Sequence, residues 1–211
     1  HDIVGDTVLI LAARNGYVAI VRMLLDKSPN VNLQNFLGST AFSYAACAGH
    51  INIMRMIFDK YSDIDLQNEA GHTALIDAAR MGHVDSVRFL LDNGADVDLQ
   101  SIYESTALIL AARFGYADIA KLLIARGAYM NASDTNGQTA LIRAAIYGKK
   151  DIVELLINKG GADIDLKGTT GKTALVYALS NGHGEIARML EKEKSSDNNN
   201  ESSDINEKEM K

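Results

Sequence analysis

A repeat with a period of 33 residues is the feature that most constrains how this chain can fold. Six threonines share one register, and a glycine follows each of them nine residues later: Thr7, Thr40, Thr73, Thr106, Thr139 and Thr173. Consecutive threonines are 33, 33, 33, 33 and 34 residues apart, and the extra residue falls in the loop pair Gly160-Gly161, where insertions cost little. Aligned copies at a fixed period predict a solenoid, in which each copy contacts only its neighbours.

Each copy predicts a pair of short helices followed by a turn. The threonine hydroxyl can accept a hydrogen bond from a free backbone N–H and so begin the first helix. The glycine can adopt the left-handed conformation that ends this helix. A second helix follows, as in residues 18–26 and 84–92, where apolar residues recur at helical spacing. Because helices this short are unstable alone, each must bury its apolar face against the next copy.

These residues resemble the ankyrin repeat in their period, their Gly-x-Thr entry, their paired helices and exits such as GADVDLQ at 94–100. The resemblance covers residues 2–190 and implies an all-α, ankyrin-type helical solenoid of six 33-residue helix-turn-helix repeats with short extended or β-turn fingers. We expect one ankyrin repeat domain, 1–190, and a polar tail, 191–211, that is disordered because it has almost nothing to bury. The expected repeats are about 1–34, 35–67, 68–100, 101–133, 134–167 and 168–190.

The copies depart from the family pattern at two places. The motif T-P-L-H-x-A reads T-A-L-I-x-A, as in 73–78, so isoleucine replaces histidine and we expect apolar packing there. Glu104 stands where the other copies have glycine, and we expect a distorted turn at this residue. The first copy has the apolar inner helix of an interior repeat, so we expect a further segment or a partner to cover that end.

Composition argues against several classes of ligand. The formal net charge is −6, of which residues 191–211 contribute −3 through four lysines and seven acidic residues. The repeats are therefore close to neutral and lack the basic stripe that nucleic-acid-binding proteins usually carry. No apolar run approaches the roughly 18 residues of a membrane span, and the single cysteine, Cys47, excludes an internal disulfide. We expect a monomeric, cytoplasmic protein whose N-terminus at His1 is truncated or processed.

The reactive residue types fit the repeat better than they fit an active site. The string GTTGKT at 168–173 lacks the first glycine of a phosphate loop, because Leu166 occupies that position. Cys47 has no evident neighbouring base, and no histidine pair has metal-ligand spacing. We therefore expect no enzymatic activity, no cofactor and no metal.

The other histidines and the charged pairs are predicted to be structural. Three histidines follow a helix-ending glycine and are expected to cap the junction between the two helices of a repeat: His50, His83 and His183. His72 lies in a turn and is the one we expect to be free for a partner. The second helices carry three pairs at i, i+4, which we expect to form a solvated ladder: Arg22–Asp26, Arg55–Asp59 and Arg88–Asp92.

The resemblance implies that the turns project as fingers, that the first helices line a concave groove, and that a protein partner lies there. The matching positions are Phe36, Leu37, His72, Arg80, Met81, Ile102, Tyr103, Arg113, Phe114, Arg143 and Tyr147. One position of the repeat reads Met81, Phe114 and Tyr147 in successive copies, which predicts an apolar and aromatic row flanked by arginines. Exposed aromatic residues beside arginines are typical of binding hot spots.

The sequence therefore predicts a non-catalytic protein–protein interaction module that binds a partner protein in its groove. Two alternatives stay open. A nucleic-acid or nucleotide sensor would use Arg113 beside Phe114 for stacking and charge. The chain could also be the substrate-presenting region of a larger enzyme or effector, whose catalytic residues lie elsewhere.

Overall fold

In the computed structural model, residues 4–60, 63–159 and 161–195 are described. Each repeat contributes an inner helix, which comes first, and an outer helix. The inner helices are α1 (Val8–Arg14), α3 (Ala41–Cys47), α5 (Ala74–Met81), α7 (Ala107–Phe114), α9 (Ala140–Ile146) and α11 (Ala174–Ser180). The outer helices are α2 (Val18–Leu25), α4 (Ile51–Phe58), α6 (Val84–Asp92), α8 (Ala117–Ala125), α10 (Lys150–Asn158) and a last helix over 184–195.

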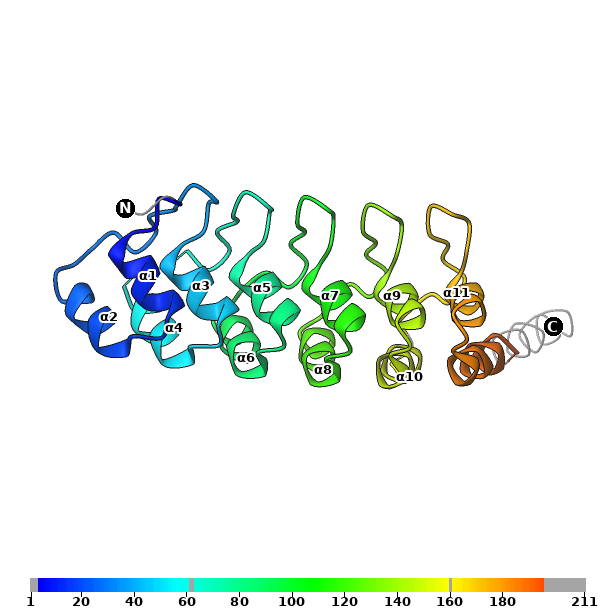
Figure 1. The fold of residues 1–211 in the computed structure, drawn as a ribbon. Helices are drawn as coiled ribbons and strands as arrows, with labels where there is room; N and C mark the ends of the chain where they lie inside the picture. Colours follow the sequence, from blue (N-terminus) through cyan, green and yellow to red (C-terminus); the bar gives the residue numbers. More distant parts are fainter. Residues whose placement is uncertain (1–3, 61–62, 160, 196–211) are drawn as a thin grey trace, which may run out of the picture.

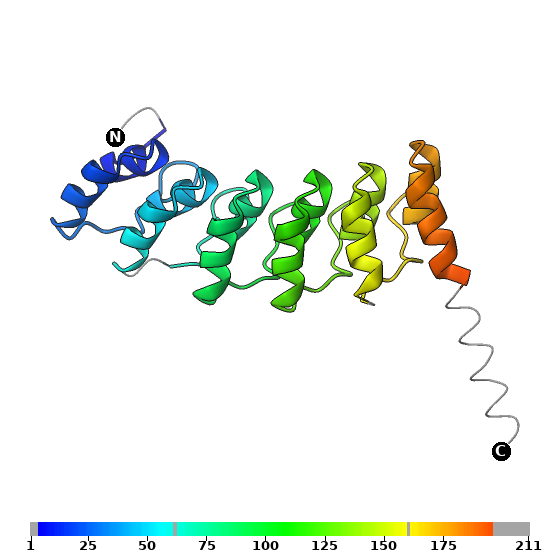
Figure 2. The same ribbon diagram turned by 90° about the horizontal axis from the view of Figure 1, so that it is seen from below.

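The helical hairpins stack side by side in chain order (Figure 1). Each inner helix packs against the next inner helix, and most outer helices pack against the next outer helix. The row is elongated and bends gently along its length (Figure 2). Within the described ranges the β structure is one isolated bridge, between Ser133 and Thr139. The fold is therefore the all-α ankyrin-type solenoid that the resemblance implied.

The repeated threonines and glycines begin and end the inner helices as predicted. All six threonines are N-cap residues whose side chain accepts a hydrogen bond from the backbone N–H three residues on. The six glycines at or just beyond the helix ends have φ values between +66° and +87°, which favours glycine over any residue with a Cβ. The local sequence thus sets the length of each inner helix.

The core runs continuously through the stack. At one position of the inner helices five successive copies carry fully buried alanines, whose small size lets neighbouring helices approach closely: Ala13, Ala46, Ala79, Ala112 and Ala145. The isoleucines that replace the family's histidine are also buried, as expected: Ile76, Ile109 and Ile142. Burial of this apolar surface between copies is the main stabilising contribution, because no helix pair encloses a core of its own.

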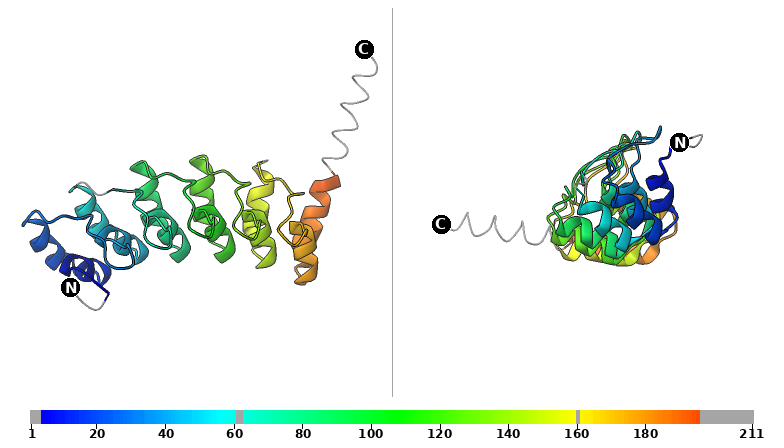
Figure 3. Two further views of the ribbon diagram at one scale, coloured as in Figure 1. Left: turned by 90° about the horizontal axis from the view of Figure 1, so that it is seen from above. Right: turned by 90° about the vertical axis from the view of Figure 1, so that its left-hand side faces the viewer.

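The fingers are short loops at residues 35–39, 68–72, 101–105 and 134–138, which project together on one side of the stack (Figure 3). In each finger the side chain of the first residue accepts hydrogen bonds from two backbone N–H groups further along: Asn35, Asn68, Ser101 and Asp134. One backbone hydrogen bond joins each finger to the next, as from Ile102 N–H to Ala70 C=O at 3.1 Å. The fingers therefore form a ladder of fixed spacing.

The turn at Glu104 is regular, so the expectation of a distortion there was wrong. Glu104 adopts φ +57° and its N–H donates to Ser101 C=O at 2.8 Å. Gly71 makes the equivalent hydrogen bond to Asn68 at 2.7 Å. The glutamate takes the left-handed conformation itself, and the ladder of neighbouring fingers holds it there.

The two ends of the described chain differ. At the first repeat the apolar side chains of Val8, Ile20 and Met23 are exposed. At the other end the last helix reaches residue 195, which is beyond the domain boundary predicted at 190. The prediction of a disordered tail falls mainly on 196–211, which lies outside the described residues. Among the described helices, none has both the length and the apolar character needed to cross a membrane.

Candidate functional site

A pocket of about 330 Å³ lies between the fingers of the third to fifth repeats and the inner helices α5, α7 and α9. We call it the central pocket. Five residues predicted to contact a partner line it: His72, Arg80, Tyr103, Arg113 and Arg143. The rest of its lining is Ser101, Ser105, Leu110, Asp134, Thr135 and Asn136. Because three arginines line this pocket, its net charge depends on which of them pair with carboxylates.

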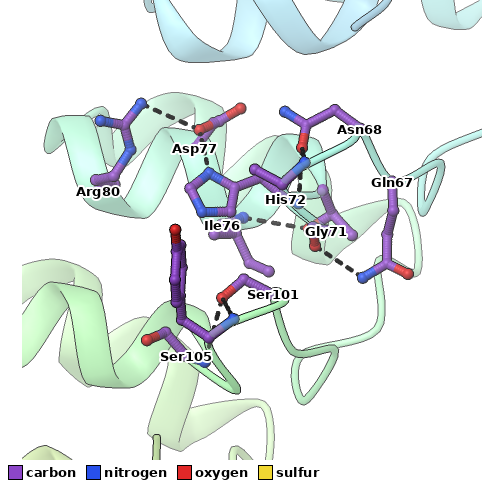
Figure 4. Close-up of polar contacts among 12 residues, drawn as sticks. Gln67, Asn68, Gly71, His72, Ile76, Asp77, Arg80, Ser101 and Ser105 are labelled. Carbon is purple, nitrogen blue, oxygen red and sulfur yellow. Dashed lines mark hydrogen bonds and ion pairs between the residues drawn. The ribbon is translucent and has the colours of Figure 1, made fainter. Parts of the chain in front are cut away.

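Asp77 on α5 neutralises the first of these arginines. Its carboxylate Oδ1 lies 3.2 Å from Arg80 Nη2, one turn along the same helix. The same oxygen lies 3.0 Å from His72 Nδ1, and both side chains point toward Asp77 in Figure 4. The His72 side chain is only 17 % exposed. The prediction that His72 is free for a partner was therefore wrong, because the carboxylate at position 77 holds it.

Asp134 neutralises a second arginine. Its side chain is 1 % exposed and accepts hydrogen bonds from the backbone N–H groups of Asn136 and Gln138 at 2.8 and 3.1 Å. Arg143 Nε donates to Asp134 Oδ2 at 2.8 Å, and Arg143 Nη2 donates to the same oxygen. Sequence reasoning missed Asp134. The signal was present, since this finger position is Asn35, Asn68 and Ser101 in the second to fourth repeats and becomes a charged aspartate at 134.

Arg113 is held by aromatic rings instead of a carboxylate. Its guanidinium carbon lies 5.5 Å from the centroid of the Phe114 ring and 5.4 Å from that of Tyr147. Across the described ranges, no acidic side chain forms an ion pair with it. Buried Leu110 occupies the position that Asp77 has in the preceding repeat, so no carboxylate lies one turn before Arg113 on α7. Arg113 thus carries the unbalanced positive charge of the pocket.

The predicted apolar and aromatic row is exposed beside the central pocket. Met81, Phe114 and Tyr147 are 46 %, 42 % and 42 % exposed. Arg113 connects the row to the pocket, because it lines the pocket and lies over two rings of the row. We call the pocket and the row together the central groove. Side chains in this arrangement offer apolar contact area and one cation on a rigid support.

The predicted finger residues are exposed at two separate places. Ile102 and Tyr103 lie on the fourth finger, where Tyr103 lines the central pocket. Phe36 and Leu37 are also exposed, but they lie on the second finger, two repeats away. The structure therefore does not bring all predicted contact residues into one site.

The ion pairs predicted along the outer helices are not formed in the part of the chain that the structure describes. Asp92 pairs instead with Arg126 of the next repeat, with 2.6 Å between Oδ1 and Nη2. Arg55 lies over the ring of Phe89, 5.1 Å from its centroid. Arginine side chains of this length reach the adjacent repeat as easily as the next turn of their own helix, and the spacing within one helix did not reveal this.

The predicted histidine caps also act differently. His50 and His83 are N-cap residues of α4 and α6, but neither makes a side-chain capping hydrogen bond. Their rings, and that of His183, lie where a Cβ would project from the helix-ending glycine of the preceding repeat. The three rings therefore fill space between repeats, and Nε2 of His183 also forms a hydrogen bond with the carbonyl oxygen of Ile146 at 3.1 Å.

The structure gives little support for reactive chemistry. Cys47 is half-buried, and the burial raises the pKa of its thiol, which disfavours the thiolate nucleophile. Among the described residues, no cluster of histidine, cysteine and carboxylate side chains could hold a metal ion.

The stacked helical hairpins and the ladder of fingers define a repeat solenoid. The chain belongs to the ankyrin repeat family: the family model described as ankyrin repeats (3 copies) matches residues 1–68, 60–134 and 108–202. No curated protein matches the chain. Ankyrin repeats are generally protein–protein interaction modules and are typically non-catalytic.

Proposed function

We propose that this chain is a non-catalytic module that binds a partner protein in the central groove. The observation that carries the proposal is the exposed row of Met81, Phe114 and Tyr147 beside a pocket with an unbalanced arginine. Exposed apolar side chains that gather in one place usually mark an interaction surface. Aromatic residues and arginine are also the side chains that dominate binding energies at protein interfaces.

The rigidity of the support favours binding. The finger ladder is fixed by a backbone hydrogen bond between each pair of neighbours, and the inner helices beneath it share one continuous core. Little conformational entropy is therefore lost when a partner docks. A partner segment that lies along the groove would contact three consecutive repeats at once.

A nucleic-acid ligand is the second candidate, because Arg113 beside two exposed rings resembles a base-stacking position. Two facts favour a protein. Arg80 and Arg143 are already paired with carboxylates, and the chain as a whole carries a charge of −6. Phosphate-rich ligands depend on several free cations, and affinity for them falls steeply with salt.

The test is to replace Phe114 and Tyr147 by alanine together and to measure binding of peptides selected on the unmodified chain from a random phage-displayed library. We expect the double variant to bind at least about tenfold more weakly, because such residues contribute most to affinity. A matched control replaces Tyr17 and Tyr129, which are exposed outside the groove, and should bind normally. Circular dichroism and thermal unfolding report whether each variant is folded. Equal affinity of the folded double variant and the unmodified chain would contradict the proposal.

A further inference from the structure

We propose that the central pocket takes an acidic side chain of the partner, a glutamate or aspartate carboxylate bound by Arg113. This inference rests on the proposed function and names the chemistry of the partner at one point of the groove.

One positive charge of the pocket is not balanced by a carboxylate. The three arginines, Arg80, Arg113 and Arg143, face two carboxylates, which pair with the first and the last of them. The balance of these three cations and two anions is +1. An anion in the pocket would therefore meet a single free guanidinium with no competing internal partner.

The same position elsewhere in the stack shows that an unpaired arginine here is exceptional. Arg14 and Arg80 occupy this position in the first and third repeats, and they lie 2.9 and 3.2 Å from Asp6 and Asp77. Arg113 lacks such a carboxylate because Leu110 stands at the position of Asp77 and Ser105 stands at that of Asp6. An exposed lysine or arginine on an outer helix is fully hydrated and needs no partner, but Arg113 lines a hollow that a docked chain would close.

The surroundings of Arg113 suit a carboxylate. Its guanidinium is positioned in advance by the rings of Phe114 and Tyr147, so little side-chain entropy remains to be lost. Ser101, Ser105 and Asn136 add polar side chains to the lining. Arginine binds carboxylates with two parallel N–H donors, which adds geometric selectivity.

A monoanion fits better than a phosphate group. A phosphorylated side chain carries a charge of about −1.5 to −2, whereas the pocket has a single unmatched cation. The carboxylate of Asp134 in the lining and that of Asp77 beside Arg80 would repel the second negative charge. The same reasoning disfavours a strand of nucleic acid, which would bring one phosphate after another past these carboxylates.

The experiment uses the full chain and peptides selected on it from a random phage-displayed library. We expect the selected peptides to share an acidic residue. For one such peptide, fluorescence anisotropy should show about tenfold weaker binding when its glutamate is replaced by glutamine, which is the effect of one charge-assisted hydrogen bond. With the variant Arg113→Gln, both peptides should bind equally, as in a double-mutant cycle.

Two further variants separate the pocket from general electrostatics. Arg88→Gln removes one exposed arginine of the outer helix α6 and should keep the tenfold difference between the two peptides. Asp134→Asn removes the carboxylate that pairs with Arg143 and raises the pocket charge to +2, so it should increase the preference for the glutamate peptide.

Failure of this inference is distinguishable from failure of the proposed function. If alanine at Phe114 and Tyr147 abolishes binding while the preference for glutamate is absent or survives in Arg113→Gln, the carboxylate assignment is overturned and the groove remains. If those alanines have no effect, the groove itself is wrong. Selected peptides without an acidic residue, or displacement of the peptide by a single-stranded oligonucleotide at physiological salt, would also overturn the assignment.

Discussion

Among single residues, Glu104 and Gly71 show how the stack can hold one amino acid in a conformation that another adopts without strain. They occupy the same position of neighbouring fingers, with φ values of +57° and +69°. A left-handed conformation costs an L-residue roughly 1–2 kcal/mol, whereas glycine adopts it freely. The finger ladder compensates for this cost at Glu104, which is why one non-glycine residue at this position leaves the fold intact.

Placing glycine at 104 and a residue with a Cβ at 71 should have opposite effects on the stability of the protein. Glu104→Gly relieves the backbone strain but loses more entropy on folding, so we expect a net gain of up to about 1 kcal/mol in the free energy of unfolding. Gly71→Ala should be destabilising by at least about 1 kcal/mol, because its Cβ would lie 2.7 Å from the backbone nitrogen of Ile102. Urea unfolding of both variants tests this. A loss of stability in Glu104→Gly would show that the glutamate side chain makes a contribution greater than the strain.

At the scale of elements, the fingers of the second to fifth repeats are shaped by the side chain of their first residue. Asparagine, serine and aspartate all accept the two backbone hydrogen bonds there, so the turn geometry does not depend on charge. Asp134 adds a second role, because its other oxygen binds Arg143 on α9. This finger is therefore tied both to its own backbone and to the inner helix that follows it.

Two substitutions of Asp134 should separate these roles. Asp134→Asn can keep the backbone hydrogen bonds, as Asn35 and Asn68 do, and loses the ion pair, so we expect a cost of roughly 1–2 kcal/mol. Asp134→Ala loses the ion pair as well and also removes the acceptor of the two backbone hydrogen bonds, so we expect a larger total cost of about 3–5 kcal/mol. Thermal and urea unfolding measure both. Equal costs for the two variants would mean that the ion pair contributes nothing beyond the turn.

At the scale of the whole molecule, the fold is a row in which every repeat depends on its neighbours. No strand or long-range crossing ties the ends of the described chain together, and the core is continuous through adjacent inner helices. The contribution of a core side chain to the free energy of unfolding should therefore depend on where its repeat lies in the row, even when the residue type and its position in the repeat are the same.

Leu141 and Leu175 provide this comparison, since they occupy the same position of α9 and α11. Leu141 is 1 % exposed between two neighbouring repeats, whereas Leu175 is half-buried. We expect Leu141→Ala to cost about 3 kcal/mol, as for a cavity in a closed core, and Leu175→Ala to cost less than half of that. Urea unfolding at a fixed temperature gives both values. Similar costs would indicate that the sixth repeat is as well enclosed as the interior ones.

The sequence by itself determined the repeat architecture, because its signals are local and recur six times. Each threonine caps the helix that begins beside it, each glycine ends the same helix, and the buried isoleucines and alanines follow from helical spacing. The exposed row of Met81, Phe114 and Tyr147 was predictable for the same reason, since one position repeated in register must lie on one face. Such features need no knowledge of contacts beyond the adjacent turn or copy.

Only the tertiary structure decided which charges pair. Asp77 holds both His72 and Arg80, Asp134 holds Arg143, and Asp92 pairs with Arg126 across a repeat boundary. Long polar side chains can reach several partners, whose interaction energies at an exposed surface differ by less than about 1 kcal/mol, so spacing along the chain does not select among them. Whether Arg113 is matched or free is settled by which carboxylates come within reach in three dimensions, and this decides the chemistry of the central pocket.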